Sequence, residues 1–67
     1  MKSFGKRLKE LREEKGLTQT ELAALFDTSR FNLLRWEKGR FEPDQDTVVK
    51  LAKFFGVPIG YLFGVEE

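Results

Sequence analysis

The sequence predicts an all-α fold, a compact bundle of five short helices. Gly16, Gly39 and Gly56, with Pro43 and Pro58, divide the chain into segments of about one short helix each. Within these segments apolar residues recur at helical spacing, and no segment alternates as a strand does. Because 67 residues suffice for one small core, we expect a single domain over residues 1–67.

The first predicted helix runs from Ser3 to Lys15. Phe4, Leu8 and Leu11 fall at helical spacing among eight charged residues, which indicates one buried stripe and a solvated outer face. Gly16 follows at the place where a left-handed cap ends a helix.

The second predicted helix opens at Thr18, with Glu21 three positions later, which is the spacing of a capping box. Its apolar residues are Leu22, Ala23 and Phe26, and the small Ala23 suits a close helix crossing. Residues 27–29, Asp-Thr-Ser, are typical of a turn.

Three further segments complete the bundle. A third helix is predicted from Arg30 to about Lys38, ending at Gly39. Asp44 is a predicted N-cap for a fourth helix that ends at Phe55, and Pro58 begins a short last turn. The fourth helix has one apolar stripe, formed by Val48, Leu51, Ala52 and Phe55.

Composition excludes most enzyme classes. The chain has no cysteine and no histidine, so we expect neither catalytic activity nor a bound metal or cofactor. Two pairs of carboxylates lie close together in the sequence, Glu13 with Glu14 and Asp44 with Asp46. Neither pair shares a helix face with an acid/base partner. The sequence shows no signal peptide and no apolar run long enough for a membrane span, so we expect a cytoplasmic protein.

Several short motifs of the sequence match one known family. They are LREEKGLTQ at 11–19, ELA at 21–23, WEKGR at 36–40, Pro43, LA at 51–52 and FGV at 55–57. Together they resemble the Cro/C1-type helix-turn-helix family of phage repressors and xenobiotic-response-element-like regulators. The resemblance runs from about Phe4 to Phe63 and implies a lambda-repressor-like DNA-binding domain. Its helix-turn-helix, at about residues 19–38, is formed by the second and third helices.

Helical geometry divides the third helix into two faces. At about 100° per residue, taking Leu33 as inward places Ser29, Trp36 and Glu37 near it and places Phe31 and Arg35 nearly opposite. Residues 29–40 hold four cationic side chains and one carboxylate, net +3, although the whole chain is only +1. This local charge suits a helix that enters the DNA major groove.

Base and backbone contacts are assigned from this geometry and from the resemblance. We expect Arg30 and Arg35 to form bidentate hydrogen bonds to guanine. Phe31, where the family usually has a polar residue, is expected either to pack on a thymine methyl group or to serve a protein partner. Expected phosphate contacts are Gln19, whose counterpart the family uses in this way, together with Ser29, Asn32, Lys38 and Arg40.

Glu37 points inward, and a lone buried carboxylate is costly, so it needs a partner. The resemblance implies an ion pair between Arg12 and Glu37. The chain departs from the family pattern in three respects. Asp27 stands where glycine is most frequent, Thr28 replaces the usual valine or isoleucine, and Phe31 and Leu34 leave two apolar groups on the face expected to meet DNA.

The sequence thus predicts a sequence-specific transcriptional regulator, with a repressor favoured, that binds a pseudo-palindromic DNA site as a homodimer with half-sites about 34 Å apart. No small-molecule effector and no membrane contact are expected. Subunit contacts are predicted among apolar residues near the carboxyl end, namely Phe54, Ile59, Tyr61, Phe63 and Val65. For Ile59, as for Leu62, a place in the core is expected more strongly than a subunit contact. The alternative is a protein-interaction module on the same scaffold, antitoxin-like or deficient in DNA binding, which the apolar Phe31, Leu34 and Phe41 support.

Overall fold

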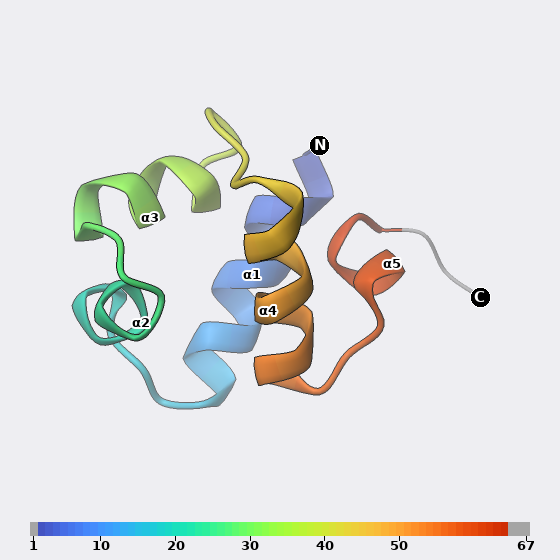
Figure 1. Ribbon diagram of the computed structural model, residues 1–67, viewed down its shortest axis with the longest axis horizontal. Coiled ribbons are helices and arrows are strands. Elements are labelled where there is room, and N and C mark those ends of the chain that lie inside the picture. The colour runs from blue at the N-terminus through green and yellow to red at the C-terminus, as the bar shows by residue number, and fades with distance from the viewer. Residues whose placement is uncertain (1, 65–67) are drawn as a thin grey trace.

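The computed structural model describes residues 2–64, which contain five helices and no strand. The helices are α1 (Lys2–Glu14), α2 (Gln19–Leu25), α3 (Arg30–Glu37), α4 (Gln45–Phe55) and α5 (Ile59–Leu62). In Figure 1, α1 passes behind α4, with α2 and α3 to one side and α5 to the other. The predicted all-α architecture and its element order are confirmed.

The core lies where these helices meet. The inward residues predicted for the first and fourth helices are buried, except that Phe55 is only partly so. Ile59 is 41% exposed, so its expected place in the core is wrong. It begins the short α5, whose only buried residue is Leu62. The buried apolar residues are Phe4, Leu8, Leu11, Leu22, Ala23, Leu33, Trp36, Val48, Leu51, Ala52 and Leu62.

Side-chain caps begin α2, α3 and α4. The Thr18 hydroxyl accepts a hydrogen bond from the Glu21 amide, and the Glu21 carboxylate accepts one from the Thr18 amide, so the predicted capping box is confirmed. Asp44 caps α4 by accepting from the Thr47 amide at 3.0 Å, as predicted. These contacts satisfy backbone donors that have no partner within the helix.

The turn between α2 and α3 is held in a left-handed conformation at Asp27, with φ 55°. Aspartate tolerates this region better than most residues other than glycine. The Thr28 amide then donates to the Ala23 carbonyl at 3.0 Å, which ends α2 and redirects the chain into α3. Asp27 therefore adopts a backbone conformation that glycine, the residue the resemblance favours at this turn, also allows.

Gly5 sets the approach of α1 to α3. A Cβ atom at this position would lie 2.6 Å from the Trp36 carbonyl oxygen and 2.8 Å from the Glu37 carbonyl carbon. Both are backbone atoms, which cannot move aside as the end of a side chain can. The absence of a side chain at Gly5 therefore lets the end of α3 rest directly on α1.

Candidate nucleic-acid interface

The α3 helix has the two faces that its sequence predicts. Leu33, Trp36 and Glu37 are buried, whereas Phe31 is 68% exposed and Arg35 is also exposed. The Trp36 indole Nε1 is buried and has no hydrogen-bond partner among the described residues. The outward face of α3 thus presents an aromatic ring and a guanidinium group to solvent.

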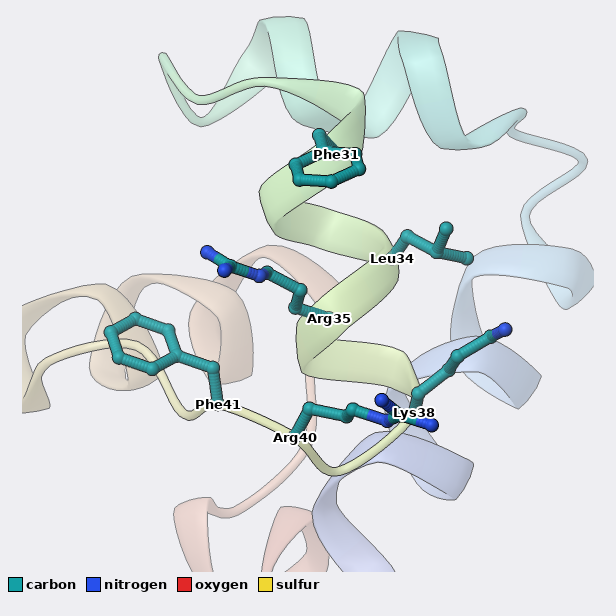
Figure 2. A pocket seen from close by; sticks show the side chains of 6 residues that line it. All are labelled: Phe31, Leu34, Arg35, Lys38, Arg40 and Phe41. Carbon is teal, nitrogen blue, oxygen red and sulfur yellow. The ribbon is translucent and has the colours of Figure 1, made fainter.

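A shallow hollow of about 470 Å³ lies along this outward face. Figure 2 shows Arg35 reaching to the side of α3 on which Phe41 lies, while Leu34 and Lys38 extend to the other side. The Arg35 guanidinium carbon lies 5.5 Å from the centre of the Phe31 ring. The surface therefore combines cationic donors with apolar side chains; its residues are Phe31, Leu34, Arg35, Lys38, Arg40 and Phe41.

Three other predicted contact residues, Ser29, Arg30 and Asn32, lie at the start of α3. Arg30, the first residue of α3, is exposed. The Ser29 hydroxyl caps α3 by accepting from the Asn32 amide at 3.0 Å. The Asn32 side chain donates to the Thr28 hydroxyl at 3.2 Å, which supplies the hydrogen bond that a partly buried Thr28 requires. Ser29 and Asn32 are therefore already engaged in holding the start of α3.

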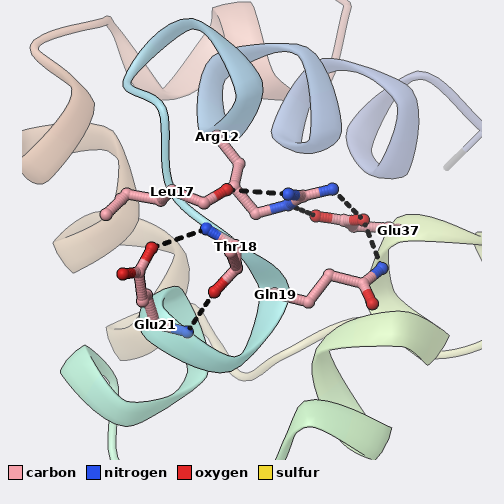
Figure 3. A network of polar contacts seen from close by, with 6 residues as sticks. All are labelled: Arg12, Leu17, Thr18, Gln19, Glu21 and Glu37. Carbon is pink, nitrogen blue, oxygen red and sulfur yellow. Dashed lines mark hydrogen bonds and ion pairs between the residues drawn. The ribbon is translucent and has the colours of Figure 1, made fainter.

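A polar network on the buried side of α3 joins three segments of the chain (Figure 3). Arg12 Nε donates to Glu37 Oε2 at 2.6 Å, and Arg12 Nη2 donates to Glu37 Oε1 at 3.2 Å. The same guanidinium donates through Nη1 to the Leu17 carbonyl at 2.8 Å. The ion pair that the resemblance implies is thus present, with both side chains largely buried.

Gln19 adds a link that sequence reasoning missed. Its Nε2 donates to Glu37 Oε1 at 3.1 Å, so the carboxylate receives hydrogen bonds from both α1 and α2. The amide expected to hold a phosphate is therefore already oriented by Glu37. No sequence signal could have found this bond, because it depends on the crossing angle of α2 and α3.

Hydrogen bonding to Glu37 raises the pKa of the Arg12 guanidinium above its ordinary value, and burial opposes that shift. The contact with Glu37 therefore favours the charged form of Arg12. Its bidentate contact fixes the position of α3 relative to α1.

The predicted subunit-contact residues are partly engaged within the chain. The Phe63 ring stacks on Phe4 with centres 5.7 Å apart, and the Arg7 guanidinium lies 4.4 Å from the centre of the Tyr61 ring. Phe54 contacts Phe26 edge to face, and Ile59 is the most exposed of the predicted residues that the structure describes. Val65 lies outside the described residues.

Within 2–64 no helix is long and apolar enough to cross a bilayer. The same range holds no group of three or more histidine, cysteine, aspartate or glutamate side chains placed to hold a metal ion.

Comparison with known proteins gives a consistent result. A family model described as helix-turn-helix matches residues 8–62. The chain is 42% identical over 65 residues to the HTH-type transcriptional regulator ImmR of Bacillus subtilis, covering 97% of the chain and 51% of that regulator. It is 41% identical over 64 residues to the cryptic phage CTXphi transcriptional repressor RstR of Vibrio cholerae, covering 96% and 58%.

An uncharacterized HTH-type transcriptional regulator from Methanocaldococcus jannaschii is 39% identical over 61 residues, which is 91% of the chain and 92% of that protein. The chain thus spans a little over half the length of the first two relatives and nearly all of the third.

Proposed function

The chain belongs to the helix-turn-helix family of transcriptional regulators, and we propose that it binds a specific DNA site by placing α3 in the major groove. The observation that carries the proposal is the exposed outer face of α3. Arg30, Arg35, Lys38 and Arg40 are all exposed on α3 or just after it. The one carboxylate of this segment, Glu37, is buried and faces away. Four exposed cations gathered on one helix and the residues after it are suited to the phosphate-lined groove of duplex DNA.

The contact residues have separate roles in this proposal. Arg30 and Arg35 form bidentate hydrogen bonds with guanine O6 and N7, each worth about 1–3 kcal/mol of discrimination. Lys38 and Arg40 contact phosphates, and Gln19 offers its second amide hydrogen to a phosphate because Glu37 occupies the first. Ser29 and Asn32 form hydrogen bonds that hold the start of α3, and both residues are also assigned as phosphate contacts.

We propose a homodimer on a pseudo-palindromic site. One helix of eight residues reads only a few base pairs, which is too little for a specific site in a genome. A second copy on the adjacent half-site, about 34 Å away, doubles the sequence read. Ile59 is the best placed subunit contact because it is apolar and exposed.

The regulatory output is proposed from the relatives. RstR is named a repressor, which favours repression by this chain, whereas ImmR is named only a regulator. Repression requires only that the bound protein exclude the transcription machinery, so a small DNA-binding unit suffices. The relatives come from bacteria and an archaeon, in which the genome lies in the cytoplasm, and we therefore propose a cytoplasmic location.

Selection of binding sites from a random duplex pool tests the proposal. We expect a palindromic consensus and an affinity that falls with salt, with a log–log slope near −5 if a dimer neutralises about six phosphates. Arg35→Ala should weaken binding to the selected site at least tenfold. Lys53→Ala is the matched control, because it removes an exposed cation from α4, outside the α3 surface, and should change affinity little.

A protein-interaction module is the second candidate. Phe31 and Phe41 are 68% and 55% exposed, which is unusual for aromatic side chains on a small protein. The absence of any detectable DNA affinity at low salt would favour this candidate over the DNA-binding proposal.

A further inference from the structure

We infer that Phe31 and Arg35 act as one unit that reads a two-base step, namely a pyrimidine carrying a C5 methyl group followed by guanine on the same strand. This inference rests on the proposed function, since it specifies what the α3 surface recognises on DNA. It names a chemical group, the major-groove methyl, that is carried by both thymine and 5-methylcytosine.

The first observation is the pairing of the two side chains. Phe31 and Arg35 are four residues apart on α3 and so lie on one face, one turn from each other. The guanidinium carbon lies 5.5 Å from the ring centre, within the range of a cation–π contact. The ring thus limits where the guanidinium can point, and the two groups approach the groove together.

The second observation is the exposure of the ring. Phe31 is 68% exposed, whereas Leu33 on the inward face of the same helix is fully buried. A ring left in water next to a base-reading guanidinium gains free energy only when an apolar group covers it. In the major groove the exposed apolar group of a base pair is the C5 methyl of thymine, or of a methylated cytosine.

The spacing of DNA bases fits the pair. Successive bases of a strand are stacked about 3.4 Å apart. With the Arg35 guanidinium on guanine O6 and N7, a ring centred 5.5 Å away reaches the neighbouring base. The methyl group of a pyrimidine preceding the guanine lies beside that guanine edge, within reach of the ring.

The test uses the site recovered by selection from a random pool. We expect thymine followed by guanine in each half-site. Replacing that thymine by uracil removes only the methyl group and should weaken binding about fourfold per half-site, the effect of one apolar carbon leaving water. In the same position, 5-methylcytosine opposite guanine should bind about fourfold more tightly than unmethylated cytosine.

Protein variants assign the effect to the ring. Phe31→Ala should bind the thymine and uracil sites equally, and Phe41→Ala, which removes another exposed ring from the same hollow, should keep the difference. Circular dichroism verifies that both variants fold. The inference is overturned if wild-type protein does not distinguish thymine from uracil, if Phe31→Ala still does, or if the selected half-sites lack the step. DNA binding without methyl discrimination would refute this inference alone, whereas no binding to any duplex would refute the proposed function with it.

Discussion

Replacing Arg12 by methionine should remove a large part of the stability of the protein. The change deletes three hydrogen bonds, two to Glu37 and one to the Leu17 carbonyl, while keeping an aliphatic side chain in the same space. Glu37 would remain buried with only the Gln19 amide to offset its charge. Breaking a buried ion pair in this way costs about 3–5 kcal/mol. A chain of 67 residues has roughly 3–10 kcal/mol of total stability, so the variant should be marginally folded.

Urea unfolding followed by the fluorescence of Trp36, the only tryptophan, measures the loss. In the Arg12→Met background, Glu37→Gln should restore about 2 kcal/mol, because a neutral amide needs no counter-charge and still accepts from Gln19. Lys9→Met is the control, since it removes an exposed cation from the same helix and should change stability by less than about 0.5 kcal/mol. A loss below about 1 kcal/mol for Arg12→Met would show that the pair acts as a solvated surface pair and would refute the argument from burial.

Three other changes test the backbone and the caps. Gly5→Ala should lower the free energy of unfolding by about 1–3 kcal/mol despite the higher helix propensity of alanine, because the new methyl group meets backbone atoms of α3; thermal unfolding measures this, and a neutral result would contradict the close approach. At position 27, glycine should be more stable than aspartate and alanine less stable, over a range of about 1–2 kcal/mol, since φ is positive; the reverse order in urea titrations would count against the left-handed turn. For Asp44, hydrogen bonds from Thr47 lower the pKa, so its stabilising effect is present above the ordinary value of 3.8 and is lost as the pH falls through the lowered pKa. The stability advantage of wild type over Asp44→Asn should therefore shrink as the pH falls from 5 through the lowered pKa of Asp44. A constant difference over this range would contradict a charged cap.

Sequence patterns sufficed for the elements of the fold because those depend on neighbouring residues. The capping box at Thr18, the cap at Asp44 and the buried stripe of the fourth helix are all set by residues within one or two turns. The outward direction of Phe31 and Arg35 likewise follows from the helical repeat once Leu33 is known to be inward.

Features that depend on helix crossings were beyond sequence reasoning. The role of Gly5 becomes visible only when α3 is placed on α1. The bond from Gln19 to Glu37 joins residues 18 positions apart, and no local pattern predicts its geometry. Ile59 was misplaced because four residues of α5 are too few to define a buried face.

The charge of the α3 surface shows how the fold turns a nearly neutral chain into a candidate DNA-binding protein. Residues 29–40 sum to +3, but this sum includes Glu37, whose charge is matched by Arg12 from outside the segment. The exposed side chains of the segment are therefore four cations and no carboxylate. Since screening by salt acts within about 10 Å, a phosphate near α3 is affected mainly by the charges on and beside this helix, which include these four cations. The buried ion pair thus has an electrostatic consequence beyond its structural one, because it removes the one negative charge of the segment from the surface that is proposed to meet DNA.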